Sequence, residues 1–198
     1  MSALTELYEK IARCEDCELA RHRTKTVPGQ GSENASIVFV GEAPGWHEDQ
    51  QGYPFVGPAG QFLDQLLASI GLRRGEVYIC NVIKCRPPGN RDPLPKEIQA
   101  CRKWLDRQLE LICPRMIVTL GRYSMATFFP GESIGRIHGK ARRQGETIYY
   151  AMYHPAAALH QQSLRRVIEA DMLKIPSLLS QAEKLPEAEK GPEQLSMF

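Results

Sequence analysis

The sequence predicts an α/β fold, a three-layer α/β/α sandwich around a central, mainly parallel four-stranded sheet. Short apolar runs rich in β-branched residues alternate along the chain with longer segments whose apolar residues recur at helical spacing. Strands that alternate with helices favour a parallel sheet covered on both faces. With 198 residues, 42% of them hydrophobic, and no internal repeat, the chain can bury one sizeable core.

Four segments are predicted as strands. The first, 37–40, runs directly into a loop rich in glycine and proline, and the second covers 77–85. The third is 115–121, and the fourth, which begins near 146, ends at His154. Their apolar character predicts burial on both faces, as in a parallel sheet.

Helices are predicted between and after these strands. Residues 59–71 place Phe62, Leu66 and Ile70 at helical spacing, with Gly71 as a stop signal. A second helix starts at Pro95, a residue favoured in the first turn. A short helix runs through Met125, Phe128 and Phe129, and a last one covers about 161–181 with a disturbance at Pro176.

Composition and charge narrow the classes of protein. The opening ten residues carry charge and no apolar run, so we expect neither a signal nor a transit peptide, and no segment is long enough to span a membrane. We therefore expect a soluble cytoplasmic protein with reduced thiols. Four glutamates against two lysines give 182–198 a net charge of −2; since the total is +2, the remaining 1–181 carries +4. We interpret 1–181 as one domain and 182–198 as a flexible tail.

Ligands of parallel α/β sheets bind outside the carboxyl ends of the strands. That rule selects the loops after Val40, Val82, Leu120 and Tyr153. The polar residues Glu42, Asn81 and His154 stand in or beside three of these loops, so the fold predicts that they converge on one site.

The six cysteines pose a separate question. Cys14 and Cys17 form a C-x-x-C pair before the first strand, and Cys85 and Cys101 are the best candidates for two further ligands. A thioredoxin-type motif is disfavoured, because the C-x-x-C pair precedes the first strand instead of opening a helix after one. The spacing of the four cysteines leaves zinc and an iron–sulfur cluster both open. Cys80, in a strand, and Cys113, at a helix end, are interpreted as small buried residues.

Several motifs together resemble one family. "GEAPG" (41–45), "GYPFVGPAG" (52–60), "NVIKCRPPGNRDP" (81–93) and "YHPAA" (153–157), with the four candidate cysteines, are similar to family 4 uracil-DNA glycosylases, over roughly residues 8–180. The resemblance implies a DNA repair hydrolase that flips deoxyuridine out of single- or double-stranded DNA and hydrolyses its N-glycosidic bond. It also implies that Cys14, Cys17, Cys85 and Cys101 hold a 4Fe–4S cluster of structural character.

The resemblance assigns roles to pocket residues. Asn81 reads the uracil edge, Phe55 stacks on the flipped ring, and His154 stabilises charge that develops on uracil O2. Glu42 positions water or stabilises a cationic sugar, and Glu48 crowds uracil C5 against a thymine methyl group. The full set of implied uracil-binding residues is Gly41, Glu42, Ala43, Glu48, Phe55, Asn81 and His154, with His154 and Glu42 catalytic.

Further residues are expected to contact DNA. In the superfamily, the loop after the motif histidine enters the minor groove, which makes Leu159 the candidate wedge and Arg165 and Arg166 nearby phosphate contacts. His138, in "GRIHG", resembles the histidine of the branch that captures uracil covalently. It follows the third strand instead of the second, so we interpret it as a DNA-facing basic residue.

The tail ends in "EQLSMF", which resembles short peptides that bind bacterial sliding clamps, through Gln194, Leu195, Met197 and Phe198. We expect a monomer associated with the nucleoid. Two alternatives to the glycosylase stay open on sequence alone: a covalent or non-catalytic uracil-DNA binder, and a structural iron–sulfur or zinc module without activity. The range of deaminated bases and the group that activates water are not fixed by the sequence.

Overall fold

The computed structural model describes residues 2–181. The predicted tail, 182–198, and the clamp-binding peptide expected at its end lie outside the described residues. Within 2–181, no helix combines the length and the apolar character needed to cross a bilayer.

The core of the fold is a six-stranded sheet with the order β1-β3-β2-β4-β6-β5. Its four central strands are parallel, as predicted: β3 (Tyr78–Asn81), β2 (Ile37–Gly41), β4 (Met116–Leu120) and β6 (Thr147–Met152). The predicted strand count is wrong, because two short antiparallel strands, β1 (Gln30–Gly31) and β5 (Ala141–Gln144), extend the edges. Polar residues dominate both edge strands, so they lack the apolar signal of a buried strand.

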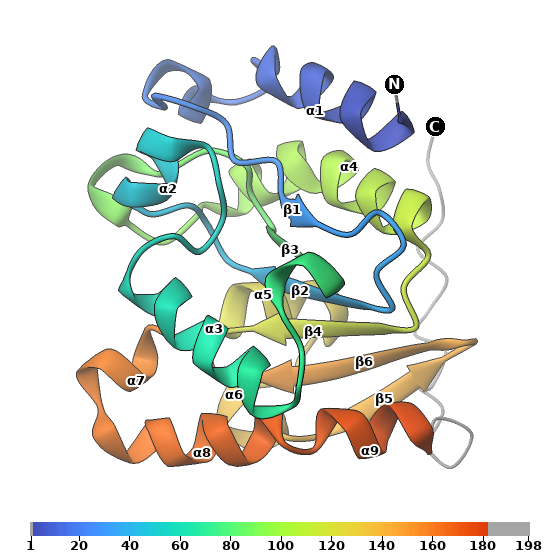
Figure 1. The fold of residues 1–198 in the computed structure, drawn as a ribbon. Helices are drawn as coiled ribbons and strands as arrows, with labels where there is room; N and C mark the ends of the chain where they lie inside the picture. Colours follow the sequence, from blue (N-terminus) through green and yellow to red (C-terminus); the bar gives the residue numbers. More distant parts are fainter. Residues whose placement is uncertain (1, 182–198) are drawn as a thin grey trace.

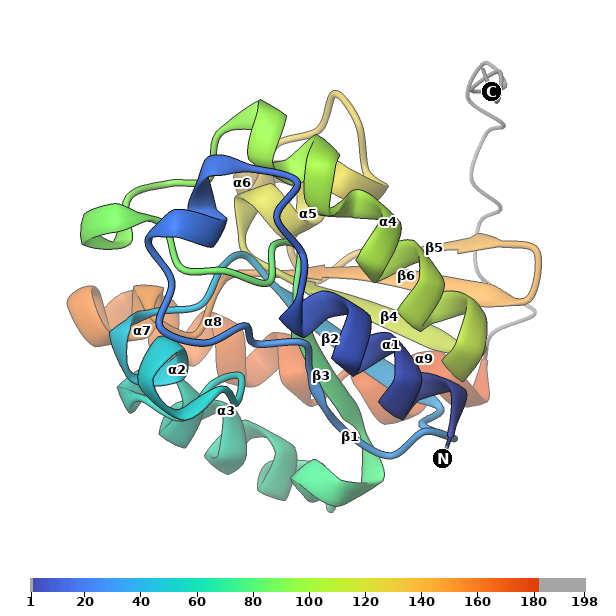
Figure 2. The same cartoon turned by 90° about the horizontal axis from the view of Figure 1, so that it is seen from above.

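Helices cover both faces of the sheet, which confirms the predicted three layers (Figure 1). On one face pack α3 (Pro58–Ser69), α8 (Gln162–Met172) and α9 (Ile175–Ser180); on the other lie α1 (Ala3–Ala12) and α4 (Pro95–Ile112). The view from above in Figure 2 shows α1 and α4 side by side over the sheet. The remaining elements are α2 (Trp46–Gln51), α5 (Arg122–Phe128), α6 (Ile134–Ile137), α7 (Ala157–His160), η1 (Glu18–Arg21), η2 (Arg74–Glu76) and η3 (Pro88–Asn90).

Alternation along the buried strands supplies the hydrophobic clusters on the two faces of the sheet. In β2, Ile37 and Phe39 face the α3 side, and Val38 and Val40 face the α4 side. Each parallel strand is therefore apolar on both faces, and this is why its sequence forms a continuous apolar run.

Helix boundaries follow local chemistry. Helix α4 begins at Pro95, as predicted, and Glu97 accepts a hydrogen bond from the Leu94 N–H at 2.8 Å in a capping box. The predicted last helix is two helices, because the chain leaves α8 after Met172 and restarts as α9 with Pro176 in its first turn. Proline lacks the N–H that a continuous helix would need there.

All four parallel strands end at the same edge of the sheet. In Figures 1 and 2, the arrowheads of these strands point toward the end of the molecule where α2 and α7 lie. Loops that start at Gly41, Asn81, Gly121 and Tyr153 therefore meet at this edge.

Candidate active site

A cavity of about 300 Å³ opens at the carboxyl edge of the sheet. Residues that are distant in sequence line it together, as the fold prediction required. Six of the seven predicted uracil-binding residues are in its wall: Glu42, Ala43, Glu48, Phe55, Asn81 and His154. The seventh, Gly41, ends β2 directly behind two of them.

Asn81, the last residue of β3, is 2% exposed. Its Oδ1 atom is buried and has no hydrogen-bond partner within residues 2–181. Gly41 makes room for this side chain, since a Cβ at position 41 would overlap Asn81 Oδ1 and lie 2.7 Å from the Phe55 ring. Buried polar atoms are nearly always paired, so an unpaired acceptor in a cavity wall indicates a ligand that donates a hydrogen bond.

Phe55 presents a buried aromatic ring to the same cavity. The ring stacks on the His154 imidazole, with centroids 5.4 Å apart and an interplanar angle of 23°. Its backbone has a φ of 54°, in the left-handed region that non-glycine residues rarely adopt. Gly60 is required beside it, because a Cβ there would overlap the Phe55 carbonyl oxygen.

His154 follows β6 and is held as a neutral imidazole. Its Nδ1 accepts a hydrogen bond from the Ala156 N–H at 3.1 Å. Burial lowers the pKa of His154 to about 4, and the nearby Glu48 carboxylate opposes that shift only in part. Because Nδ1 is the acceptor, Nε2 carries the proton, and the ring offers a single N–H donor.

Glu42 lies one residue beyond β2, against the start of α5. Its Oε1 accepts a hydrogen bond from the Tyr123 N–H at 3.0 Å. Gly121, with a φ of 98°, permits this approach, because a Cβ there would overlap Glu42 Oε1. Burial raises the pKa of Glu42, against the opposing effects of the Tyr123 N–H and the Arg122 charge.

Glu48 organises the loops around the cavity through three backbone hydrogen bonds. Its Oε1 accepts from the N–H groups of Val56 at 2.9 Å and Gly57 at 3.0 Å, and its Oε2 accepts from Gly45 at 3.1 Å. The carboxylate therefore joins the start of α2 to the Phe55 loop.

The segment 87–93 also lines the cavity, and sequence reasoning gave it no role although its residues belong to a quoted motif. Arg91 is fixed there by two hydrogen bonds to the buried carboxylate of Glu97, at 2.6 and 2.9 Å. Asp92 forms an ion pair with Arg122. This segment therefore connects α4 and α5 at the mouth of the cavity.

The structure brings the four candidate cluster ligands, Cys14, Cys17, Cys85 and Cys101, to one hollow between η1, the loop after β3 and α4. Within residues 2–181 all cysteines are free of disulfide bonds. Cys80 is buried, as predicted. The prediction for Cys113 is wrong: it is exposed, because the chain turns out of α4 there with a φ of 49°.

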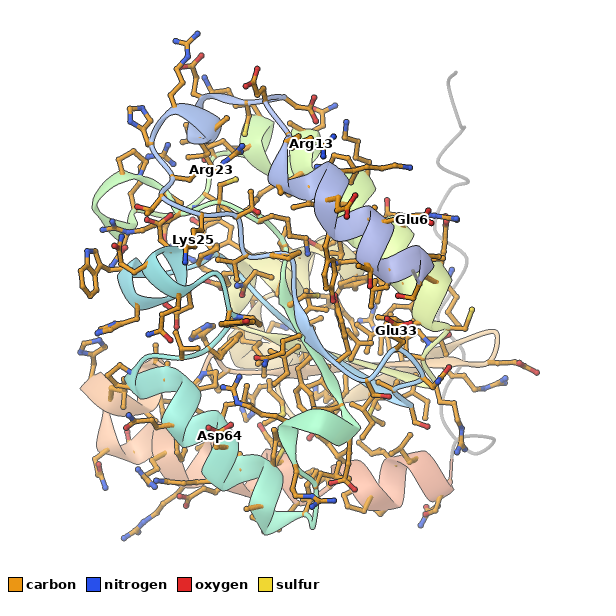
Figure 3. The ribbon with its side chains drawn as sticks, turned by 45° about the horizontal axis from the view of Figure 1, so that its top comes forward. Glu6, Arg13, Arg23, Lys25, Glu33 and Asp64 are labelled. Carbon is orange, nitrogen blue, oxygen red and sulfur yellow. The ribbon has the colours of Figure 1, made fainter. Side chains whose placement is uncertain are left out.

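Three of these sulfurs accept N–H hydrogen bonds. The donors are Trp104 Nε1 to Cys14 at 3.3 Å, Arg23 Nη1 to Cys85 at 3.4 Å, and the Lys84 backbone to Cys101 at 3.3 Å. Arg23, which is labelled in Figure 3, lies on the loop after η1 and lines this hollow. In the described part of the chain, no group of three or more His, Cys, Asp or Glu side chains is placed to hold a single metal ion. Four free thiols are the donor set that an iron–sulfur cluster would use, and hydrogen bonds to the sulfurs are among the interactions that tune such a group.

The predicted DNA contacts have different surroundings. Leu159, on α7, is 48% exposed. Arg165 pairs with Glu169, donates to Gln65 and lies over the Phe62 ring, and Arg166 is exposed. His138 does not stand free: its Nδ1 lies 2.8 Å from a carboxylate oxygen of the buried Asp171, and its ring contacts Tyr153. These pairs give Arg165 and His138 structural partners that the sequence did not indicate.

The amino-acid sequence of the chain is similar to those of known proteins. Residues 28–173 match the family model described as the uracil DNA glycosylase superfamily. The chain is 47% identical to the type-4 uracil-DNA glycosylase of Sulfurisphaera tokodaii, over 90% of this chain and 86% of that protein. It is 48% identical to the type-4 enzyme of Archaeoglobus fulgidus, over 90% and 94%, and 43% identical to that of Thermotoga maritima, over 86% and 92%. The chain therefore belongs to the uracil-DNA glycosylase superfamily and, within it, to the type-4 uracil-DNA glycosylases.

Proposed function

We infer that this chain is a uracil-DNA glycosylase, a DNA repair hydrolase that cleaves the N-glycosidic bond of deoxyuridine in DNA. The products are free uracil and an abasic site. Beyond the family, the observation that carries this function is the buried, unpaired Oδ1 of Asn81 in a cavity lined by Phe55 and His154.

Asn81 reads the flipped base. A base in a duplex is unreachable, so the deoxyuridine must leave the stack and enter the cavity. Asn81 Oδ1 then accepts from uracil N3–H, while its Nδ2 donates to uracil O4. Cytosine offers the opposite pattern at these positions, an N3 acceptor and an N4 donor. Asn81 Oδ1 would then face an acceptor and Asn81 Nδ2 a donor, so neither hydrogen bond could form.

Phe55 and Glu48 give the cavity its shape. The Phe55 ring stacks on the face of the uracil ring, as aromatic side chains do with flipped bases. Glu48, held by three backbone N–H groups, stands beside the base and crowds C5, where thymine carries a methyl group.

His154 and Glu42 serve the bond-breaking step. As the bond between C1′ and N1 breaks, its electron pair leaves with uracil, and negative charge develops on O2. The Nε2–H of neutral His154 donates to that oxygen. Glu42 has one of two roles: its carboxylate stabilises the positive charge that develops on the sugar, or it positions the water whose oxygen bonds to C1′. The water proton is released to Glu42 or solvent, so the step balances as a hydrolysis.

The four cysteines are proposed to hold a 4Fe–4S cluster. They fit such a group because four free thiols line one hollow and N–H groups point at three of the sulfurs. When bound, the cluster supplies a structural cross-link. Cys14 and Cys17 would fix the segment after α1, and Cys85 and Cys101 the loop after the Asn81 strand and helix α4.

The DNA surface and partners complete the proposal. Leu159 enters the space left by the flipped nucleotide, and Arg166 contacts phosphate, with Arg165 and His138 as secondary basic groups. The enzyme acts as a monomer on nucleoid DNA, and the terminal "QLSMF" binds a sliding clamp. A labelled "GPEQLSMF" peptide that fails to bind the organism's clamp would end the clamp proposal.

Uracil release tests the function. The wild-type chain is incubated with single-stranded oligonucleotides that carry one deoxyuridine, and free uracil and alkali-labile abasic sites are quantified. His154→Ala should slow release by about 10²- to 10³-fold, because it removes the donor to developing charge. His22→Ala, at an exposed histidine that does not line the cavity, is the control. A stable protein–DNA adduct without free uracil would contradict the hydrolase.

A further inference from the structure

We propose that Arg74 is a positioning residue that holds Phe55 in the backbone conformation that presents its ring to the base. This inference rests on the proposed function of the cavity. It starts from the φ of 54° at Phe55, a conformation that is unfavourable for an aromatic residue and persists only when its surroundings hold it.

Arg74 holds the carbonyl side of Phe55. Its Nη1 donates to the Pro54 carbonyl at 3.0 Å, and its Nη2 donates to the Phe55 carbonyl. The next N–H, of Val56, donates to Glu48 at 2.9 Å. The peptide group between Phe55 and Val56 is thus bound at its oxygen by a cation and at its nitrogen by an anion.

These contacts fix the torsions of Phe55. The angles φ and ψ of a residue describe the rotation of the two peptide planes that flank it. Arg74 binds the carbonyl oxygens of both planes, and Glu48 binds the N–H of the second. Holding both planes holds φ and ψ, and the direction of the ring follows from them.

Arg74 is itself well fixed. Its Nε donates to Asp64 Oδ1 at 2.5 Å, and its side chain is only 25% exposed. Asp64, labelled in Figure 3, lies on α3, while Arg74 stands in η2 before β3. All three donor positions of the guanidinium face acceptors, which is a geometry that the single ammonium group of lysine cannot reproduce.

The crowding at Gly60 adds an independent reason for the arginine. A Cβ there would overlap the Phe55 carbonyl, so α3 closes over this oxygen. Without Arg74 the oxygen would lose its charged donor in this crowded position, and the left-handed conformation would lose the restraint on both flanking carbonyls. The ring would then spend less time in the stacking position, while the DNA-binding surface on α7 would be unchanged.

The chain offers a matched control in the neighbouring residue. The Arg73 side chain is 85% exposed and pairs with Glu76 three residues away. Single-turnover excision from deoxyuridine-containing single-stranded DNA is compared for wild type, Arg74→Gln and Arg73→Gln. Arg74→Gln should lower the single-turnover rate constant about 10- to 100-fold, the loss expected for a misplaced substrate-positioning group, and Arg73→Gln should stay within about twofold.

Two further measurements separate positioning from general damage. Binding to DNA with a tetrahydrofuran abasic analogue, which leaves the base cavity empty, should change by less than about twofold in Arg74→Gln. In a Phe55→Ala background, Arg74→Gln should cost almost nothing more, because its effect passes through the Phe55 ring. If Arg74→Gln does not fold, Arg74→Lys replaces it, with a smaller loss in the same direction.

Wild-type activity in Arg74→Gln, or losses that multiply in the double variant, would overturn the proposal. If instead the wild-type chain releases no uracil at all, the proposed function fails, and the two failures are distinguishable.

Discussion

Replacing Asn81 with alanine separates the activity of this protein from its stability. In the free protein, Asn81 Oδ1 is buried without a partner within residues 2–181, and it lines a cavity that is already open. Truncation therefore breaks no hydrogen bond of Asn81 Oδ1 within residues 2–181, and it enlarges an existing space instead of creating a closed one. We expect the free energy of unfolding to stay within about 1 kcal/mol of wild type, a shift in Tm of about 2–4 °C.

The same change should strongly impair catalysis. Two hydrogen bonds to the uracil edge are lost in a buried site, at roughly 1–3 kcal/mol each. The sum, about 2–6 kcal/mol, converts to a loss of roughly 30- to 10⁴-fold in kcat/KM.

Excision from a deoxyuridine oligonucleotide tests the predicted loss of catalysis, and thermal unfolding of the same preparations tests the predicted stability. Asn34→Ala, which changes an exposed asparagine, is the control. Activity within threefold of wild type, or a large fall in Tm that parallels the loss of activity, would refute the reasoning.

Four further predictions concern the pH dependence of catalysis, the pH dependence of stability, the wedge and the cluster. Because burial raises the pKa of Glu42, kcat/KM should fall at acidic pH on a limb that Glu42→Gln removes; because burial lowers the pKa of His154 to about 4, an inflection near pH 6.5 that persists in Glu42→Gln would contradict a neutral His154. Since unfolded histidine binds a proton near 6.5 and folded His154 only near 4, stability should fall as the pH drops between these values, and less so in His154→Gln. Leu159→Ala should slow excision from double-stranded DNA about tenfold but from single strands within about twofold, while Leu173→Ala, 59% exposed on another surface, should do neither. Cys85→Ser should lower the bound iron, the visible absorption and the Tm, whereas Cys113→Ser, at an exposed cysteine, should leave all three unchanged; equal iron in both would exclude Cys85 as a ligand.

The parallel core of the sheet was predictable because its strands are buried on both faces and therefore form apolar runs. The edge strands were not, since β1 has two residues and β5 reads Ala-Arg-Arg-Gln. Helix α1 does carry a signal, because Leu4, Leu7 and Ile11 recur at helical spacing on its buried face, so this helix was also predictable.

The candidate site also contains some residues that were predictable from the sequence and others that were not. Residues at strand ends, such as Asn81 and His154, were predictable because parallel strands bring their carboxyl ends together. The contacts of Arg74 with main-chain carbonyls about twenty positions away leave no pattern in the sequence. Asp171, the partner of His138, is 33 residues away in the sequence, so nothing near His138 indicates the pair. The basic character of His138 alone therefore predicted an exposed, DNA-facing role.

The cysteines show what structure adds to spacing. Fifteen residues between Cys85 and Cys101 left zinc and an iron–sulfur cluster open, because spacing alone does not place thiols in space. The fold brings both to the hollow that Cys14 and Cys17 also line, with N–H donors on three of the four sulfurs.

The central claim is that the cavity around Asn81, Phe55 and His154 removes uracil by reading its edge. Its most direct measurement is base release by the wild-type chain from matched oligonucleotides that differ only in one base, deoxyuridine, deoxycytidine or thymidine. We predict release of free uracil with an abasic site left behind, and no detectable release of cytosine or thymine. Release of cytosine at a rate comparable to uracil, or no release of uracil by the folded chain, would contradict it.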